Sequence, residues 1–401
     1  MIVLRTERLA AGGEVVARAD DGRIVFVEGA VPEERVRAEV YEERPRFLRA
    51  RVVEVLEPGP HRVEPPCPHF GRCGGCSLQH FEPEAQSAAK VEAAREAVRR
   101  LARGATDDAV VDPAWSGPAY AYRARARLLV EGGRLGYRAR RTHRLVEVER
   151  CPILVPALEA SLPRLAAALP DDARGELPIM AAGDRVTAWG EGFAGFEPDA
   201  VELVPPGRGL ETTDAAGRAF AGPATFAQAN PSGNDAMLET VGRWLPPSAL
   251  ALELYSGSGN FTRVLERTSA RVVAAEADAD AVRLADRVRG AATSLWRLDA
   301  RRALERAARD ALAPDLVLVD PPRAGLDRGV PDRLARLGPA TIVYVSCDPG
   351  TFARDLARLG PRGYRVERLR FFDLYPQTPH VEVIGRLVRS PTPEAPAEAS
   401  R

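Results

Sequence analysis

A single cysteine near the carboxyl end of the chain is the strongest candidate for a nucleophile. Cys347 follows a strongly apolar stretch, residues 341–345, and stands just before Asp348 and Pro349. The stretch predicts a buried strand, and Pro349 predicts the start of a helix. A thiol at a helix start gains thiolate character, because the helix dipole favours negative charge there. The alternative is a buried cysteine with a purely structural role.

A turn that contains glycines predicts a ligand site earlier in the chain. Residues 249–255 have the pattern of a buried strand, and Gly257 and Gly259 follow it before a helix that starts near Asn260. Glycines let the backbone turn tightly and approach a ligand at the helix start. A dinucleotide site would have a third glycine where Thr262 stands. The turn therefore fits S-adenosylmethionine better than a dinucleotide.

Acidic residues at the ends of neighbouring strands support this interpretation. Glu276 ends the strand predicted at residues 271–275, where an acid accepts hydrogen bonds from ribose hydroxyls. Asp299 follows the next strand and is placed to meet the adenine edge. The alternative interpretation is a pair of turn glycines with solvated acids around them.

Asp320 and Arg323 indicate which class of methyltransferase the sequence fits. They follow a strand predicted at residues 316–319, at the edge where open α/β sheets bind ligands. Methyltransferases that act on exocyclic amino groups carry an aromatic residue at the position of Arg323, and C5-cytosine RNA methyltransferases carry a cysteine in this loop. Neither feature is found in this sequence, so the catalytic half has Cys347 as its one thiol.

One thiol is what methylation of uracil at C5 requires. The C5 atom is a poor nucleophile, so a thiolate adds first to C6 and gives an enolate whose C5 can attack the sulfonium methyl group. A base must then remove the C5 proton before the cysteine leaves. Glu382, which precedes a final apolar strand, is the candidate base, because partial burial raises a carboxyl pKa towards the useful range.

The amino-terminal half carries a second group of cysteines: Cys67, Cys73, Cys76 and Cys151. The first three share a loop rich in glycine and proline, which lets their sulfurs converge. Four thiolates around one centre suit either tetrahedral zinc or a [4Fe-4S] cluster. His69 and His80 keep a zinc site with mixed ligands open, and small buried side chains without a metal are a third interpretation.

The predicted elements fall into two patterns. From about residue 249, strand and helix alternate, which predicts a doubly wound parallel sheet of the Rossmann type. The first 58 or so residues instead predict a small barrel of the oligonucleotide-binding type, with a turn at 20–22 and strands at 14–17, 23–27, 35–41 and 48–56. Residues 44–51 interleave arginines with Phe47, which suits phosphates and a stacked base. A solvated edge strand explains these arginines as well.

Between these parts the sequence predicts a helix and a small sheet. Residues 84–101 have an amphipathic helix pattern, and Gly132 and Gly133 indicate a hairpin. Strands are predicted at 123–130, 135–138 and 145–148. Arginines and tyrosines crowd this sheet, so we expect it to face RNA, with a merely solvated sheet as the alternative.

Composition bounds the possibilities. A chain of 401 residues with 45% apolar content should hold two or three domains with real cores. No apolar run reaches the length of a membrane span, and the first residues do not resemble a signal peptide, so we expect a cytoplasmic protein. Five cysteines, an odd number, suit a reducing compartment. Lys90 is the only lysine, a bias that a GC-rich genome explains without any functional cause.

Taken together, the motifs resemble the bacterial RNA 5-methyluridine methyltransferases of the TrmA/RumA type over nearly the whole chain. The resemblance implies an amino-terminal TRAM domain, a [4Fe-4S] cluster on Cys67, Cys73, Cys76 and Cys151, the nucleophile Cys347 and the base Glu382. Residues 226–230 are similar to the FxQxN segment of the family, whose glutamine lies beside both methyl donor and base. The implied contacts with S-adenosylmethionine are Gln228, Tyr255, Asn260, Glu276, Asp299 and Asp320. Ser256, Asp348 and Tyr375 depart from the common pattern of the family without removing a reactive group.

The expected organisation is therefore a barrel at residues 1–58, a central α+β domain with the cluster loop at 59–215, a methyltransferase domain at 216–390 and a disordered tail at 391–401. The expected partner is RNA, and the expected state is a monomer without membrane contact. A TRAM-like barrel together with a cluster resembles the branch that acts on 23S rRNA. The alternatives are a transfer-RNA uridine methyltransferase and a non-catalytic RNA-binding or folding factor with a vestigial donor pocket.

Overall fold

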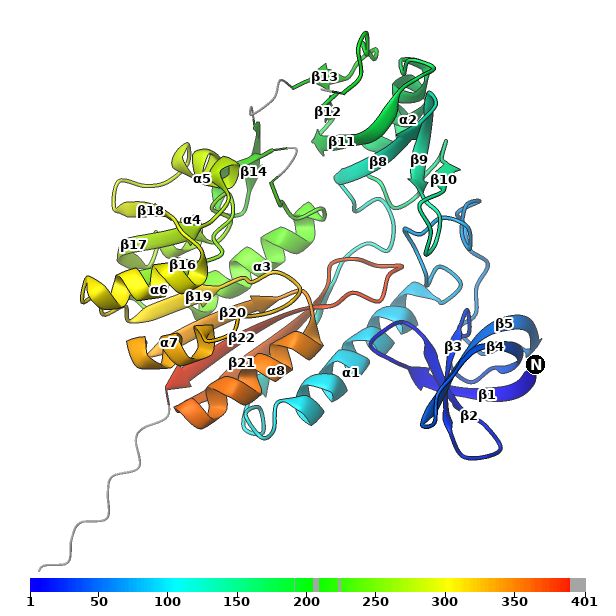
Figure 1. Ribbon diagram of the computed structural model, residues 1–401, viewed down its shortest axis with the longest axis horizontal. Helices are drawn as coiled ribbons and strands as arrows, with labels where there is room; N and C mark the ends of the chain where they lie inside the picture. Colours follow the sequence, from blue (N-terminus) through cyan, green and yellow to red (C-terminus); the bar gives the residue numbers. More distant parts are fainter. Residues whose placement is uncertain (191, 205–208, 223–224, 390–401) are drawn as a thin grey trace, which may run out of the picture.

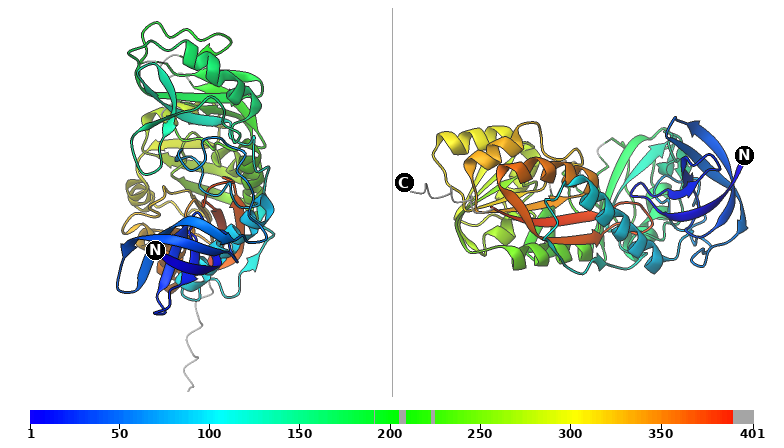
Figure 2. Two further views of the ribbon diagram at one scale, coloured as in Figure 1. Left: turned by 90° about the vertical axis from the view of Figure 1, so that its right-hand side faces the viewer. Right: turned by 90° about the horizontal axis from the view of Figure 1, so that it is seen from below.

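A computed structural model describes residues 1–190, 192–204, 209–222 and 225–389 of the chain. The tail expected to be disordered, residues 391–401, lies outside these ranges. Figure 1 shows the described residues as a barrel, a central domain and a larger α/β domain, with a long helix between the first and the last. The barrel and the α/β domain lie at opposite ends of the molecule (Figure 2). Over the described residues, the helices are too short or too polar to cross a membrane.

The amino-terminal barrel closes on itself, in the order β1-β2-β3-β5-β4 with β1 paired to β4. Its strands are β1 (Ile2–Leu9), β2 (Val15–Arg18), β3 (Ile24–Glu28), β4 (Arg35–Glu43) and β5 (Phe47–Glu57). Apolar side chains from every strand fill the interior, because alternate residues of a strand point to one face. Strand β1 was not predicted, since charged residues interrupt its apolar pattern.

Helix α1 (Pro83–Leu101) links the barrel to the α/β domain, as predicted for residues 84–101. One face of α1 packs against β21 (Tyr364–Asp373) and α8 (Pro349–Leu359) in the α/β domain. Leu78, in the loop before α1, is part of the barrel core. The segment around α1 therefore joins two parts of the molecule that lie far apart in sequence.

The central domain is a sheet in the order β10-β9-β8-β11-β12-β13, with helix α2 packed on it. Its elements are β8 (Arg125–Glu131), β9 (Arg134–Arg138), β10 (Leu145–Glu147), α2 (Pro156–Ala167), β11 (Arg174–Ala182), β12 (Arg185–Ala188) and β13 (Glu202–Leu203). The predicted hairpin joins β8 to β9. The short strands β6 (Val110–Val111) and β7 (Trp115–Ser116) pair with β21, so part of the segment expected in the central domain extends the α/β sheet.

The α/β domain is built on a mostly parallel sheet in the order β18-β17-β16-β19-β20-β22-β21-β6. Its further strands are β16 (Ser248–Leu254), β17 (Ser269–Glu276), β18 (Thr293–Arg297), β19 (Leu316–Val319), β20 (Thr341–Ser346) and β22 (Glu382–Arg389). Its helices are α3 (Pro231–Trp244), α4 (Thr262–Leu265), α5 (Ala279–Asp286), α6 (Ala300–Arg309), α7 (Val330–Leu337) and α8, followed by the 3₁₀ turn η1 (Gly360–Arg362). A hairpin of β14 (Leu210–Asp214) and β15 (Gly217–Ala221) lies beside α5. This confirms the predicted doubly wound fold, in which the carboxyl ends of β16, β19 and β20 meet at one edge.

Candidate active site

The turn after β16 has the geometry of a ligand cradle. Gly257 and Gly259 have positive φ angles of 55° and 91°, and a Cβ atom placed on Gly257 would meet nothing within 4 Å. Tyr255 also has a positive φ, 62°, which is rare for a bulky side chain and marks a constrained position. The carboxylate of Glu276 accepts a hydrogen bond of 2.9 Å from the Gly257 amide. An acid at the end of β17 thus fixes the turn at the end of β16.

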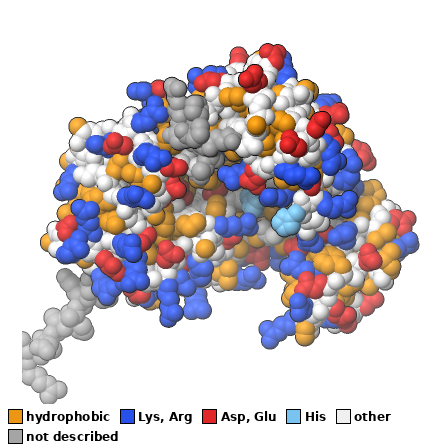
Figure 3. Space-filling model, turned by 45° about the horizontal axis from the view of Figure 1, so that its top comes forward, with side chains coloured by type: hydrophobic (Ala, Val, Ile, Leu, Met, Phe, Trp, Pro, Cys, Tyr) orange, Lys and Arg blue, Asp and Glu red, His pale blue; other side chains and the backbone are white. Residues whose placement is uncertain are grey.

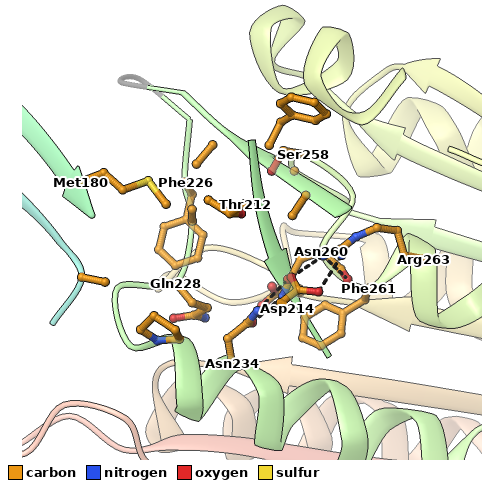
Figure 4. A pocket seen from close by; sticks show the side chains of 18 of the residues that line it. Met180, Thr212, Asp214, Phe226, Gln228, Asn234, Ser258, Asn260, Phe261 and Arg263 are labelled. Carbon is orange, nitrogen blue, oxygen red and sulfur yellow. Dashed lines mark hydrogen bonds and ion pairs between the residues drawn. The ribbon is translucent and has the colours of Figure 1, made fainter. Parts of the chain in front are cut away.

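A cavity of about 1150 Å³ opens at this edge of the sheet, between the α/β domain and the central domain. Residues implied as ligands line it together with both proposed catalytic residues: Gln228, Tyr255, Asn260, Glu276, Asp320, Cys347 and Glu382. Figure 4 shows part of its wall, where Gln228, Asn260 and Phe226 lie around the open space. This volume is slightly larger than the usual range of small-molecule sites, about 300–1,000 Å³, and leaves room for a second occupant.

Asp299 is the one implied donor contact that does not line this cavity. Its side chain caps α6, where Oδ1 accepts a hydrogen bond of 2.8 Å from the Arg302 amide. It lies 3.5 Å from the Arg302 guanidinium as well. The pattern of an acid after a strand predicts both a helix cap and a ligand contact, and in the structure Asp299 is a helix cap.

Three carboxyl groups at the strand ends are strongly desolvated. Burial raises the pKa of Glu253 to about 8, that of Asp320 to about 7 and that of Glu382 to about 8. The charge of Asp320 adds to the rise at Glu382. Desolvation penalises the ionised form, so these acids titrate near neutral pH. The predicted rise in the pKa of Glu382 is confirmed.

Cys347 lies near these acids, and the pKa of its thiol is raised, whereas the sequence predicted that it would be lowered. Burial raises the pKa of its thiol to about 12, and the charges of Glu382, Asp320 and Asp348 add to the rise. Arg323 opposes it more weakly. The expected gain of thiolate character from α8 is therefore wrong. The Asp348 carboxylate accepts a hydrogen bond of 2.9 Å from the Thr351 amide, so the residue that caps α8 next to Cys347 carries a negative charge.

Gln228 is held by a tyrosine from another loop. The hydroxyl of Tyr375 donates a hydrogen bond of 2.9 Å to Gln228 Oε1. The neighbouring Asn260 is fixed by two amide hydrogen bonds to Asn234, of 3.1 and 2.9 Å. Asn230 caps α3 and donates to the Leu374 carbonyl at 2.9 Å. Each amide in this part of the wall therefore has a defined orientation.

Two features of the site were not found from the sequence. Asn234, which orients Asn260, lies one turn into α3 after Asn230. Arg263 forms a buried ion pair with Asp214, at 2.7 Å, which ties the β14–β15 hairpin to the cavity wall (Figure 4). Arg263 follows the glycine turn directly, but its partner comes from a hairpin with no distinctive pattern, so sequence alone offered no basis for pairing them.

The four amino-terminal cysteines line a second cavity, of about 420 Å³. Burial raises the pKa of Cys76 to about 12 and that of Cys151 to about 11. His69 Nδ1 is buried and has no hydrogen-bond partner, and both His69 and the buried Tyr137 line this cavity. Across the described ranges, no three His, Cys, Asp or Glu side chains converge tightly enough to hold one metal ion. The four thiols therefore lie around the cavity and do not converge on a single metal position.

His80 is not part of this cavity, although the sequence left it open as a zinc ligand. Its ring is buried against the barrel, where Nε2 lies 3.0 Å from the Ala30 carbonyl. Burial lowers the pKa of its ring, so the ring is neutral. Among the two histidines considered, only His69 reaches the cysteines.

Many of the arginines expected to face RNA are paired with acids. Arg127 and Arg138 both reach Glu176, at 3.3 and 3.1 Å, on the exposed side of the central sheet. On the barrel, Arg44 lies 2.8 Å from Glu42, and Arg49 packs near the Phe47 ring and pairs with Glu14. Figure 3 shows arginine side chains on both sides of the hollow between the α/β domain and the rest of the molecule. Phosphates would have to compete with these exposed pairs, which are individually weak.

Comparisons with known proteins agree on the family of the chain. Residues 219–389 match the family model described as tRNA (Uracil-5-)-methyltransferase, and residues 5–53 match that of the TRAM domain. The chain is 35% identical to the 23S rRNA (uracil(1939)-C(5))-methyltransferase RlmD of Halomonas elongata, over 93% of this chain and 86% of that protein. It is 34% identical to RlmD of Chromohalobacter salexigens, with 96% and 89% covered. An uncharacterized RNA methyltransferase of Streptomyces avermitilis is also 34% identical, with 94% and 96% covered.

Among solved structures, the Pyrococcus abyssi tRNA (uracil-54, C5)-methyltransferase in complex with S-adenosyl-L-homocysteine matches the fold. The TM-score is 0.73, with 21% sequence identity, and the match covers 96% of this chain and 100% of that one. At this identity the likeness concerns the fold alone. It supports the arrangement of a Rossmann-like domain with the additional parts described above.

Proposed function

The chain belongs to the RNA uracil-C5 methyltransferases, and from this premise we propose that it methylates a uridine through a covalent adduct on Cys347, with Glu382 as the base. One observation carries the proposal: Cys347, Glu382, Asp320 and Gln228 line one cavity together with the glycine turn. A nucleophile, a base and a place for a methyl donor thus share a single site.

We propose that the donor, S-adenosylmethionine, lies along the glycine turn. The open space at Gly257 lets the backbone approach a ligand, and Glu276, Tyr255 and Asn260 line the same wall. Glu276 would accept hydrogen bonds from the ribose hydroxyls, as acids at this strand end do in related folds. Because Asp299 caps α6 and does not line the cavity, we assign it no contact with the donor.

The chemistry follows from the surroundings of Cys347. The thiol of Cys347 first loses its proton to solvent, because only the thiolate is nucleophilic. The sulfur then forms a bond to C6 of the uracil, and the electrons of the C5–C6 double bond move to the carbonyl at C4. C5 then takes the methyl group from the sulfonium, whose carbon–sulfur bond breaks. Glu382 removes the C5 proton, the double bond forms again and Cys347 leaves as the thiolate, which takes up a proton from solvent. A carboxyl pKa of about 8 suits this step, because a base works best near the ambient pH.

We further propose that Cys67, Cys73, Cys76 and Cys151 hold a [4Fe-4S] cluster. A cluster sets its thiolate ligands further apart than one zinc ion does, which suits four thiols around a cavity of about 420 Å³. Iron and sulfide analysis and the absorption spectrum of anaerobically purified protein test this. Cys73→Ser should lose both the colour and several degrees of melting temperature, whereas colourless protein with stoichiometric zinc would contradict the proposal.

We propose 23S rRNA as the substrate, because the RlmD proteins match most of the chain at 34–35% identity. The experiment is a map of 5-methyluridine in ribosomal and transfer RNA from cells with and without the gene, each complemented with wild type or with Cys347→Ala. Loss of one methylated uridine from 23S rRNA, restored by wild type only, is the expected result. Loss from transfer RNA instead would move the substrate to the alternative class, and restoration by Cys347→Ala would refute the nucleophile.

A further inference from the structure

Arg323 lines the same cavity as Cys347, and the proposed function leaves it without a role. It follows two prolines in the loop after β19. Its Nε atom lies 3.5 Å from Asp348 Oδ2. Because Asp348 directly follows Cys347 in the chain, this ion pair brings a guanidinium into the immediate neighbourhood of the thiol.

The loop that carries Arg323 is held in place by α8. Asp355, which is buried on that helix, accepts a hydrogen bond of 2.7 Å from the Leu326 amide. The guanidinium of Arg354, on the same helix, donates a hydrogen bond of 2.7 Å to the Ala324 carbonyl. The helix begins directly after the acid that pairs with Arg323, so one helix positions both partners of the ion pair.

The other two arginines that line this cavity, among the described residues, are bound elsewhere. Arg263 forms the buried ion pair with Asp214, and Arg185 donates a hydrogen bond of 3.2 Å to the Glu211 carbonyl. The side chain of Arg323 is instead 68% exposed at the cavity wall and pairs with the acid next to the nucleophile. Within the described part of this wall, Arg323 is therefore the cation that stands beside the thiol.

The titratable groups around Cys347 and Arg323 come from several elements: Glu382 on β22, Asp320 after β19, Asp348 before α8, and Tyr375 and His380 in the loop before β22. Burial and the three carboxyl groups raise the pKa of the thiol, and Arg323 lowers it. Burial raises the pKa of the tyrosine to about 12 and lowers that of the histidine, so both rings are neutral at pH 7. Among these groups, only the arginine favours the thiolate.

We propose that Arg323 stabilises the thiolate of Cys347 and thereby increases the rate at which the sulfur attacks C6 of the uracil. The S–H bond breaks and its proton goes to solvent, while the guanidinium stays protonated throughout. This inference rests on the proposed function, because it takes Cys347 as the nucleophile. It goes further in giving a role to the residue that stands where methyltransferases of exocyclic amino groups carry an aromatic ring.

The thiolate fraction of the free protein can be measured without RNA, through the rate at which iodoacetamide alkylates Cys347. This reagent reacts with the thiolate and is uncharged, so an arginine does not attract it. Full-length wild type, Arg323→Gln and Arg323→Lys are compared between pH 7 and 9.5. Mass spectrometry follows the tryptic peptide of residues 337–354, in which Cys347 is the only cysteine. Arg328→Gln is the matched control, because Arg328 is exposed in the same loop and does not line the cavity.

Arg323→Gln should be alkylated at Cys347 roughly three- to tenfold more slowly at each pH, since an opposite charge on an exposed side chain lowers a pKa by about half a unit to one unit. Arg323→Lys keeps the charge and should retain most of the rate, and Arg328→Gln should match wild type. With saturating target RNA and S-adenosylmethionine, the single-turnover rate of methyl transfer by Arg323→Gln should fall by a similar factor.

An alkylation rate in Arg323→Gln equal to that of wild type would overturn the inference while leaving the proposed function intact. A loss confined to the affinity for RNA would also overturn it and make Arg323 a phosphate contact. Equal slowing in Arg323→Lys would show that the charge is not the cause. Methylation by Cys347→Ala would instead refute the proposed function. The melting temperatures of both Arg323 variants should match that of wild type, because the side chain is exposed.

Discussion

At the residue scale, desolvation decides the chemistry of the site. Glu382 is about 4% exposed, and its pKa of about 8 is set mainly by burial. Cys347, with a pKa of about 12, is protonated at neutral pH. Binding of a base next to these groups replaces the remaining water and adds a polar partner, so the protonation states are coupled to the substrate.

The rate at which methylated RNA is released from Cys347 should depend on pH through Glu382. The base must be ionised to accept the C5 proton, and its pKa is raised to about 8, so kcat should rise roughly tenfold per pH unit below that value and level off above it. Single-turnover rates of release of methylated RNA, measured between pH 6 and 9.5, test this. A flat profile from pH 6 to 8 would contradict the assignment, and a rise that continues without a plateau up to pH 9.5 would make the thiol of Cys347 the limiting group.

Glu253 should make the free energy of unfolding fall as the pH rises. Burial raises its pKa to about 8, and its carboxyl accepts a hydrogen bond from Thr262. The native state thus binds a proton that the unfolded state has lost above about pH 4.3. The contribution of the Glu253 carboxyl to the free energy of unfolding is complete below that pH and is lost as the pH rises through about 8. The free energy of unfolding should fall over this window, and Glu253→Gln should flatten part of the fall; an equally steep fall in the variant would contradict it.

At the element scale, most of the parallel sheet could be predicted and the loops that complete the site could not. Strands β16, β17, β19 and β20 were predicted to within two residues, because buried parallel strands are continuous apolar runs. The hydrogen bonds between Gln86 and Gln377 join residues 291 positions apart. No local pattern encodes such a contact. For the same reason the sequence identified Gln228 only by resemblance and did not reveal its partner Tyr375.

The only lysine of the chain, Lys90, also makes long-range contacts that the sequence did not predict. A GC-rich genome explains why arginine replaces lysine elsewhere, but Lys90 is 2% exposed and bound to Asp373. A guanidinium is larger and planar, so Lys90→Arg should overfill the site and cost roughly 1–3 kcal/mol in unfolding free energy. Chemical denaturation with Arg100→Lys, an exposed change on the same helix, as the control measures this. A variant as stable and as active as wild type would show that the site accepts either cation.

At the scale of the whole molecule, ion pairs connect the barrel to the central domain. Glu28, 3% exposed, meets Arg140 at 3.0 Å, Arg141 at 2.6 Å and Arg51 at 3.3 Å. We propose the domain boundaries at residues 58, 215 and 390, with α1, β6 and β7 as the part of the central segment that packs on the methyltransferase sheet. The proposed active site opens between the methyltransferase and central domains, so their docking shapes it.

The barrel should contribute phosphate contacts without touching the donor site. The double change Arg44→Ala with Arg46→Ala should weaken RNA binding and reduce its salt dependence by about two in the log–log slope. The affinity for S-adenosylmethionine should stay unchanged, because neither residue lines the cavity. Fluorescence anisotropy at several salt concentrations measures the slope, with Arg301→Ala on α6 as the control. An unchanged slope would exclude these two arginines from the RNA contacts.

The covalent adduct on Cys347 is tested most directly by Glu382→Gln, which removes the proposed base and leaves the nucleophile in place. With target RNA and S-adenosylmethionine, this variant should accumulate protein linked to methylated RNA, because the C5 proton cannot leave. The adduct should survive denaturant, and mass spectrometry after nuclease and protease digestion should place a methylated uridine nucleotide on the peptide that contains Cys347. Free methylated RNA without an adduct would move the base elsewhere, and an adduct on any other residue, or one that persists in Cys347→Ala with Glu382→Gln, would contradict the mechanism.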